Sequence, residues 1–235
     1  MSQDPSASSG SVPTYRPVGG HAVLVEFGAT IDKRIHDQVV KLDAALKVAP
    51  FEGFVEAVPA YSSILVCFDP LVADHRTTEA AIAERLTAEV PEAIGAMREV
   101  EVCYDPEFAP DLAAVAEASG LLPEDVISAH LSGDYSVFMY GFAPGYAYLA
   151  GVPEAIQQPR KPVPIRGIAA GSVLIAGPQC LVSTLTMPTG WWIIGRSPTK
   201  ILDAASDERP FLFDVGDAVR FRRISRAEFD ARCLA

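Results

Sequence analysis

The stretch from residue 141 to residue 198 constrains the fold of this chain most, because it holds eight glycines and eight prolines in 58 residues. The other 177 residues hold only 20 of the chain's 36 glycines and prolines. At this density, glycine and proline divide the backbone into short segments joined by tight turns. The stretch therefore predicts a β-barrel of many short strands with glycine and proline at its corners.

The same stretch also differs from the rest of the chain in charge. It contains Arg160, Lys161, Arg166 and Arg196 with a single acid, Glu154, for a net charge of +3 in a chain of net charge −11. A cationic, turn-rich segment in an acidic protein predicts an anion-binding site. Barrel corners explain the glycines and prolines equally well, but they do not explain the shortage of acids.

The first hundred residues show two segments with apolar residues at helical spacing and four segments typical of strands. The sequence predicts helices that begin at Thr30 and at Thr77 or Thr78, and strands over residues 21–27, 51–58, 62–68 and 97–104. This β-α-β-β-α-β order is the ferredoxin-like pattern. We therefore predict a disordered tail over residues 1–15 and a ferredoxin-like α/β domain over residues 16–100.

The chain changes character after Asp105 and Pro106. An alanine-rich helix is predicted over residues 111–119, ended by Gly120, and a second helix begins at Pro123. Short strands follow over residues 135–142, 172–177, 180–184, 190–195 and 218–224, before a capping box at Ser225 that opens a last helix. Residues 101–235 are predicted to form the β-barrel, which makes the whole chain an α+β protein.

Composition excludes several classes of function. The acidic balance argues against nucleic acid and anionic membranes as partners, because both would repel the chain. No run of about 18 apolar residues predicts a membrane span. The polar N-terminus does not resemble a signal peptide, and four well-separated cysteines predict free thiols. We expect a cytoplasmic protein.

Familiar catalytic motifs are absent from the sequence. It contains no P-loop, G-x-G-x-x-G, G-x-S-x-G or H-E-x-x-H pattern. The four histidines and four cysteines are too scattered for metal-ligand spacing, so no metal site is predicted. If the chain takes part in an ATP-dependent reaction, the nucleotide is expected to bind elsewhere.

Three arginines are candidate contacts for a carboxylate. Arg160 and Arg166 lie beside turn-forming residues, and each offers a planar fork of donors that suits a carboxylate. The alternative is that they are ordinary surface arginines. Arg196 lies between Gly195 and Pro198, so it can stack on Trp192 or close a pocket.

His130 is the candidate catalytic base, although a structural function is favoured. It follows Val126 by four residues on a predicted helix, so both point to the same apolar face. A core histidine bonded to a carbonyl is typical there. Its place just upstream of the turn-rich stretch keeps general base catalysis open. Cys180 has no partner nearby in sequence, which disfavours a nucleophilic function.

The remaining candidates are aromatic and turn residues. An apolar pocket wall that carries phenol hydroxyls can be formed by Tyr140, Phe142, Pro144, Gly145, Tyr148 and Trp192. The same residues can instead fill the barrel. Ser172 and Gln179 flank a predicted strand. Each can form a hydrogen bond either with a ligand or within a turn.

Three motifs in this stretch carry a resemblance to a known family. They are GFAPGYAYLAGV, PRKPVPIRGIAAGSVLIAGPQ and PTGWWIIGRSP. In them the chain resembles the allophanate hydrolase subunit 1 family, which includes the B subunits of 5-oxoprolinase and the sporulation kinase inhibitor KipI. It is also similar to the matching half of the carboxyltransferase domain of urea carboxylases, subdomains C and D. The resemblance covers nearly the whole chain after about residue 15.

The resemblance implies a ferredoxin-like domain followed by a cyclophilin-like β-barrel. It also implies two partner proteins: a homologous second barrel protein of the allophanate hydrolase subunit 2 or 5-oxoprolinase C-subunit type, and a protein of the 5-oxoprolinase A-subunit type. The reaction of that system is the ATP-dependent opening of 5-oxoproline to glutamate, with ATP used by the complex. A small carboxylate substrate would suit the cationic stretch.

Two departures from the family pattern bear on the substrate. After Gln179 the family has T-G-x-Y-P where this chain has residues 180–184, CLVST, and Thr189 replaces the first glycine of PGGW. A related amide, lactam or ureido acid is therefore an alternative substrate.

Two other functions stay open on the sequence. One is a KipI-like inhibitor that grips a sensor histidine kinase through its tyrosines, Trp191 and Trp192. The other is a component of a biotin-dependent carboxyltransferase, which would need a separate carrier protein.

Overall fold

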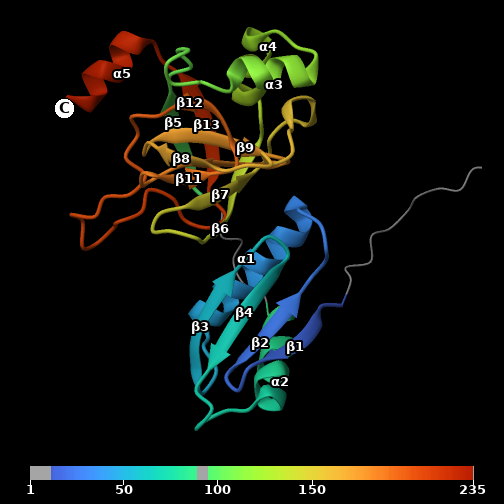
Figure 1. The fold of residues 1–235 in the computed structure, drawn as a ribbon. Coiled ribbons are helices and arrows are strands. Elements are labelled where there is room, and N and C mark those ends of the chain that lie inside the picture. Colours follow the sequence, from blue (N-terminus) through green and yellow to red (C-terminus); the bar gives the residue numbers. More distant parts are fainter. Residues whose placement is uncertain (1–11, 89–94, 235) are drawn as a thin grey trace, which may run out of the picture. The chain divides into compact units, whose positions relative to one another are not determined.

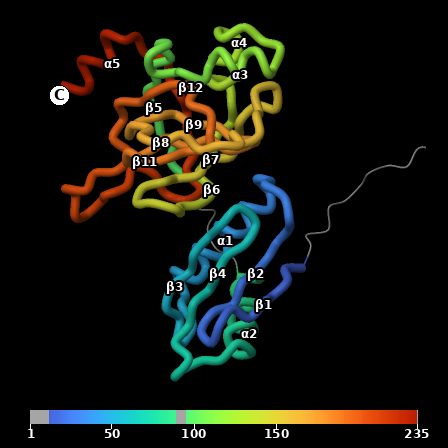
Figure 2. The backbone as a smooth tube through the Cα atoms, viewed as in Figure 1, coloured from blue at the N-terminus to red at the C-terminus, as the bar shows by residue number. Residues whose placement is uncertain are grey.

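The structure is a computed structural model that describes residues 12–88 and 95–234. The chain divides into two compact units, residues 1–93 and residues 94–235. Figures 1 and 2 show both units.

The first unit is a four-stranded antiparallel sheet in the order β1-β2-β4-β3, with two helices on one face (Figure 1). Its elements are β1 Thr14–Val18, β2 Ala22–Glu26, α1 Lys33–Val48, β3 Phe54–Pro59, β4 Ser63–Phe68 and α2 His75–Leu86. Alternate residues of the central strands are buried because a sheet covered on one face points every second side chain into the core.

Both helices begin at an aspartate and not at the predicted threonines. Asp32 caps α1 by accepting hydrogen bonds from the backbone amides of Arg34 and Ile35, at 2.8 and 3.3 Å. Asp74 caps α2 in a capping box with Thr77. Aspartate and threonine are both good N-caps, so sequence alone does not separate them. Val90, which the sequence places on the second helix, falls outside the described residues.

The first edge strand lies partly in the predicted tail. Residues 14 and 15, predicted to be disordered, belong to β1, which pairs with β2 along its whole length. An ion pair between Arg16 and Glu26, with Nε to Oε2 at 2.6 Å, joins the two strands. The prediction is wrong here because β1 is polar and short, so it depends on pairing with β2 and not on its own hydrophobic pattern. Residues 1–11 of the predicted tail lie outside the described part of the chain.

The second unit is built on a seven-stranded sheet in the order β12-β9-β10-β7-β6-β13-β5. Its strands are β5 Met97–Val102, β6 Tyr135–Tyr140, β7 Ala147–Ala150, β9 Ser172–Ala176, β10 Gln179–Val182, β12 Trp192–Arg196 and β13 Ala218–Arg223. A separate two-stranded ribbon pairs β8 Ile165–Ile168 with β11 Met187–Thr189 (Figure 2). The helices are α3 Leu112–Ser119, α4 Pro123–Leu131 and α5 Arg226–Cys233, with a short 3-10 helix at Glu154–Ile156.

The seven-stranded sheet closes almost completely into a barrel. Its edge strands are β12 and β5, and Arg196 of β12 bridges to Cys103, which directly follows β5. Each of these residues donates its amide to the carbonyl of the other, at 2.8 and 2.9 Å. We call this junction the barrel seam. The α+β class with a barrel domain is confirmed.

The predicted last strand of the first domain belongs to the barrel instead. Residues 97–102 form β5, which pairs in parallel with β13 over six positions. A boundary after residue 100 would cut this strand. In the first unit, β1 takes the edge beside β2 that this strand would have occupied in a β-α-β-β-α-β sheet. An alternating pattern predicts a strand, but it does not specify the strand with which it pairs.

The barrel interior is a single apolar core. All seven strands of the sheet contribute buried side chains to it, and so do α3 and α4. Gly120 ends α3 in the left-handed conformation, with φ of 66°, as the sequence predicts. A smaller apolar cluster lies on the other face of β7, β9, β10 and β12, where Ile168 of β8 and Met187 of β11 pack against it. In the described part of the chain, no helix has both the length and the apolar character needed to cross a bilayer.

Candidate functional site

The outer side of the barrel carries an aromatic surface that includes part of the predicted site. Tyr148 of β7 meets Trp191 edge to face, with ring centroids 5.8 Å apart. The guanidinium of Arg160 lies 5.5 Å from the centroid of the Trp191 ring. Phe142 meets Tyr146 in a similar edge-to-face contact at 5.7 Å. We call these five residues the outer aromatic face.

The alternation of β7 places Tyr148 on this side. Ala147 and Leu149 point into the barrel core, so Tyr148, between them, points outward. The ribbon of β8 and β11 packs beside Tyr148 and Trp191 through Ile168 and Met187. The strand pattern and the ribbon together bury Trp191, leave Tyr148 partly exposed, and leave Phe142 exposed.

Charge on this face is positive and largely unneutralised. Arg160 and Arg166 are exposed, and in the described residues neither forms an ion pair. Lys161 is different, because its Nζ lies 2.5 Å from Oδ2 of Asp111. Partial burial raises the pKa of the Tyr148 phenol, while the positive charge of Arg160 opposes that rise. Arg160 therefore lies close enough to act on both the phenol and the indole.

This arrangement suits a small apolar molecule that carries a carboxylate. A guanidinium held over an indole keeps its donors pointing outward in a fixed plane. The carboxylate can take two of these donors, while apolar carbons of the ligand rest on the partly exposed ring of Tyr148. Arg166 of β8 adds a second exposed guanidinium on the neighbouring ribbon.

Phe142 of this face shows backbone strain. It has a φ of 70°, the left-handed region, and 72% of its surface is exposed. A bulky side chain is unfavourable in that conformation, and such strain concentrates at functional sites. This exposed, strained residue of the outer aromatic face makes its loop a candidate binding surface.

Other predicted residues lie away from the outer aromatic face. The guanidinium of Arg196 lies at the barrel seam, over the rings of Phe108 at 5.5 Å and Phe229 at 5.9 Å, and not beside Trp192. Trp192 donates its indole N–H to the carbonyl of Pro159 at 2.7 Å, with Lys161 over its ring.

The turn residues of the GFAPGY motif, and Tyr140 directly before it, make structural contacts. Tyr140 donates its hydroxyl to the carbonyl of Phe213 at 2.7 Å. The carbonyl of Pro144 accepts a hydrogen bond from the Thr184 hydroxyl at 2.6 Å. Gly145 has φ of 72°, and a Cβ there would lie 3.0 Å from Thr184 and 3.1 Å from Leu202. Thr184, within the departure from the family pattern, thus packs directly against this loop.

Ser172 and Gln179 also differ in their surroundings. Ser172 is buried, and its hydroxyl donates to the carbonyl of Ala169 at 2.8 Å, which is a turn contact. Gln179 precedes the inward-pointing Cys180 in β10, so its side chain is on the outward side of that strand.

His130 lies in the barrel core, with no exposed surface. Its Nδ1 is 2.7 Å from the Tyr104 hydroxyl, and its Nε2 is 3.7 Å from Sγ of Cys180. Burial lowers the pKa of His130 to about 3 and raises the pKa of the Cys180 thiol. These placements favour the structural interpretation of both residues over a catalytic one. The expected carbonyl partner of His130 is a phenol hydroxyl instead.

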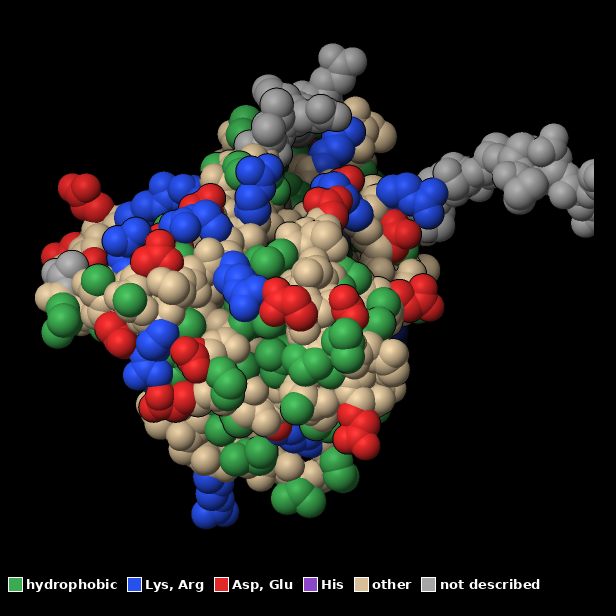
Figure 3. All heavy atoms as spheres, turned by 90° about the horizontal axis from the view of Figure 1, so that it is seen from above, with side chains coloured by type: hydrophobic (Ala, Val, Ile, Leu, Met, Phe, Trp, Pro, Cys, Tyr) green, Lys and Arg blue, Asp and Glu red, His purple; other side chains and the backbone are tan. Residues whose placement is uncertain are grey.

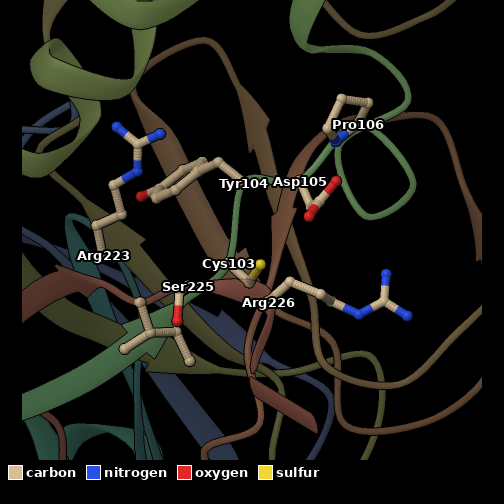
Figure 4. Close-up of a pocket in the computed structure, with 8 residues that line it drawn as sticks. Cys103, Tyr104, Asp105, Pro106, Arg223, Ser225 and Arg226 are labelled. Carbon is tan, nitrogen blue, oxygen red and sulfur yellow. The ribbon is translucent and has the colours of Figure 1, made fainter. Parts of the chain in front are cut away.

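The structure separates the two tryptophans, and it adds a cavity that sequence reasoning passed over. Trp191, and not Trp192, contacts Arg160 and Tyr148. The two tryptophans are adjacent, so they alternate across the sheet, and the sequence does not show which one faces outward. A separate cavity near the barrel seam, shown in Figure 4, has a lining that contains no predicted site residue. Among the described residues, no group of three or more His, Cys, Asp or Glu is placed to hold a metal ion.

Comparison with known proteins agrees with this architecture. Residues 13–213 match the family model of the carboxyltransferase domain, subdomain C and D. The chain is 37% identical to the B subunit of 5-oxoprolinase from Bacillus subtilis (strain 168), over 91% of this chain and 94% of that protein. It is 34% identical to the B subunit of 5-oxoprolinase from Escherichia coli O157:H7, over 87% of this chain and 93% of that protein.

Solved structures show the same fold. The crystal structure of TTHA0988 has a TM-score of 0.77 and 31% identity, and covers 87% of this chain. This chain spans only 40% of the longer TTHA0988 chain. The Kluyveromyces lactis urea amidolyase structure, with a TM-score of 0.76 and 18% identity, matches 97% of this chain and 16% of its own length. The sequence match over residues 13–213 and the shared fold show that the chain belongs to the carboxyltransferase domain, subdomain C and D, family.

Proposed function

We propose that this chain is a subunit of an ATP-dependent hydrolase that opens amide or lactam bonds, most like 5-oxoprolinase. The observation that carries the proposal is the 37% identity to a protein named as the B subunit of 5-oxoprolinase, over nearly the full length of both. The substrate of that enzyme, 5-oxoproline, is a small lactam ring with one carboxylate. The outer aromatic face offers the matching chemistry, an aromatic wall beside free guanidinium groups.

The chain acts with partners in this proposal. It contains no nucleotide-binding motif, so ATP binds to the complex through another protein. A homologous second barrel protein and a protein of the 5-oxoprolinase A-subunit type complete the enzyme. Exposed apolar residues support a protein contact near the outer aromatic face, since Phe142 and Val163 are each 72% exposed and Ile165 is 42% exposed.

Reconstitution tests the proposal directly. The chain is co-expressed with its expected partner proteins, and glutamate released from 5-oxoproline is measured with and without ATP. We expect glutamate release that requires ATP and all of the proteins. Absence of turnover in a correctly assembled complex, with related amides and ureido acids also unreactive, would reject the function. Capture of a sensor histidine kinase in place of the expected partners would favour the inhibitor function instead.

Arginine substitutions test the location of the site. Arg160→Gln and Arg166→Gln should each raise KM for 5-oxoproline about tenfold and change kcat little, because each removes a charged hydrogen bond to the carboxylate. Arg220→Gln is the matched control, because Arg220 is exposed on β13 and lies outside the outer aromatic face. Unchanged KM in both site variants would place the substrate elsewhere.

A further inference from the structure

The backbone on both sides of Arg160 is bonded to the two neighbours of Trp191. The carbonyl of the preceding proline accepts the indole N–H of Trp192 at 2.7 Å. On the other side, the amide of Lys161 donates to the carbonyl of Gly190 at 2.7 Å. These two bonds hold the Arg160 backbone beside the ring over which its guanidinium lies.

A carboxylate from another part of the barrel unit holds the same segment. Oδ2 of Asp111 lies 2.5 Å from Nζ of Lys161 and also accepts the backbone amide of Ile193 at 2.7 Å. The amide of Asp111 donates in turn to the carbonyl of Ile193 at 3.1 Å. The Lys161 ammonium lies 5.1 Å from the centroid of the Trp192 ring. Asp111 therefore joins the segment that carries Arg160 to β12.

Asp111 occupies the N-cap position of α3 but does not cap that helix with its side chain. An N-cap aspartate ordinarily accepts hydrogen bonds from the first amides of its own helix and stabilises it. Here the carboxylate is directed to Lys161 and to β12 instead. The contribution of this side chain is therefore to the position of the 159–161 segment and not to the start of α3.

Burial separates this ion pair from those on the exposed surface. Figure 3 shows basic and acidic side chains interspersed on the face that carries α5. The pair of Arg223 and Glu124 has side chains that are 48% and 64% exposed, and such pairs contribute little. The side chains of Lys161 and Asp111 are only 10% and 15% exposed. A buried pair adds little net stability compared with apolar residues of similar size, but it requires one arrangement of its two groups.

We propose that Asp111 is a positioning residue of the outer aromatic face. Through Lys161 it fixes the 159–161 backbone, so that the Arg160 guanidinium lies over Trp191 with its donors available to a carboxylate. Asp111 does not itself contact the ligand. The inference rests on the proposed function for the identity of that carboxylate, whereas the positioning can be measured without any substrate.

The two tryptophans report the positioning directly. Trp191 and Trp192 are the only tryptophans in the chain, so the purified full chain labelled with fluorotryptophan gives two fluorine NMR signals, which single Trp→Phe variants assign. We expect Asp111→Asn to shift both signals, because Arg160 and Lys161 then move from the two rings. Asparagine keeps an oxygen acceptor for the backbone amide of β12, so the variant removes mainly the charge.

A double-mutant cycle shows whether Asp111 acts through Arg160. Arg160→Gln alone should shift the Trp191 signal. In the Arg160→Gln background, Asp111→Asn should change the Trp191 signal little further, because the group that it positions is already absent. The Trp192 signal should still change in that background. A general structural effect of Asp111 would instead shift the Trp191 signal equally in both backgrounds.

Asp217→Asn is the matched control. Asp217 is also a buried carboxylate that binds one cation, with Nε of Arg98 at 2.8 Å, and accepts backbone amides that include Ala96 at 2.7 Å. This variant should lose stability but leave both tryptophan signals unchanged, because these contacts lie outside the outer aromatic face. Lys161→Met removes the other half of the pair and should shift both signals as Asp111→Asn does. Thermal unfolding of each variant confirms that it is folded.

Kinetics of the reconstituted complex test the link to the substrate. Asp111→Asn should raise KM for 5-oxoproline about tenfold with little change in kcat, and should raise it little further in the Arg160→Gln background. The Asp217→Asn complex should keep the wild-type KM.

Three outcomes would overturn the inference. The first is an unchanged Trp191 signal in Asp111→Asn, and the second is an equal shift with and without Arg160. The third is a wild-type KM for Asp111→Asn in a complex in which Arg160→Gln raises KM. A complex without turnover would reject the proposed function but not the fluorine result, so the two failures are distinguishable.

Discussion

The buried cluster around His130 shows how one residue's surroundings determine its chemistry. Burial raises the pKa of Tyr104 well above its usual range, so its hydroxyl keeps its proton and forms a hydrogen bond with Nδ1 of His130. Burial also keeps the imidazole ring neutral, and its Nε2 faces Sγ of Cys180. A neutral, fully buried histidine of this kind stabilises the fold and does not contact a substrate.

This cluster predicts that stability depends on pH. The pKa of His130 falls from 6.5 in the unfolded chain to about 3 in the fold because of burial. The unfolded state therefore binds more protons between pH 6.5 and pH 3. The stabilisation is fully present above pH 6.5 and is lost as pH falls toward 3, by as much as roughly 4–5 kcal/mol. Urea unfolding across this range measures the slope.

His130→Gln tests that assignment. Glutamine can still accept and donate hydrogen bonds but does not titrate, so the variant should be less stable at pH 7, by about 1–3 kcal/mol, with a flatter pH dependence. His21→Gln is the control, because His21 is exposed and its loss should leave the slope unchanged. A His130→Gln slope equal to that of the wild type would contradict the assignment. Retained turnover by the folded variant would exclude general base catalysis.

At the scale of elements, α5 is held to the barrel mainly through one aromatic residue. The Phe229 ring lies 4.4 Å from the Phe108 ring and is buried with Cys103 and Ile224. A capping box of Ser225 and Glu228 begins the helix, as the sequence predicts. The capping box determines where the helix starts, and Phe229 fixes which face of the helix meets the barrel.

Phe229→Ala should release α5 without unfolding the barrel. The loss of a buried ring costs about 3 kcal/mol of stability. The intrinsic stability of an eight-residue helix is too small to compensate for that loss. Hydrogen exchange should therefore accelerate in the α5 amides and stay slow in β6, β7 and β10. Leu234→Ala is the control, because Leu234 is 90% exposed. Accelerated exchange throughout the barrel would show instead that α5 is part of its cooperative core.

At the scale of the whole molecule, β5 determines where the second unit begins. Residues 97–102 supply the strand that pairs with β13, and the seam then joins Cys103 to Arg196. The fragment 94–235 should therefore fold cooperatively, whereas the fragment 101–235 should not, because it lacks most of β5. Near-ultraviolet circular dichroism and urea unfolding compare the two fragments. Equal cooperativity would show that β5 is dispensable to the barrel.

The candidate site was only partly predictable from sequence. The turn-rich stretch supplied Tyr148 and Arg160, which meet on the outer aromatic face. The sequence could not show that Arg196 lies away from the candidate site, because only closure of the barrel brings its side chain to the barrel seam. The cavity residues Asp105 and Arg223 gave no signal, since 118 positions separate them and parallel pairing alone brings their strands together.

The sequence by itself determined the elements of this protein. Some features are local properties of the sequence: turns that require glycine or proline, alternating strand patterns, and helix caps. They therefore identified the barrel class and most of the strands. Only the tertiary structure decided which strands pair, which arginines are free, and which side of each strand faces the core. Those outcomes depend on contacts between residues distant in sequence, and a strand's hydrophobic pattern does not specify its partner. The stretch at 141–198 therefore predicts a barrel, while pairing across the whole unit decides where its binding surfaces lie.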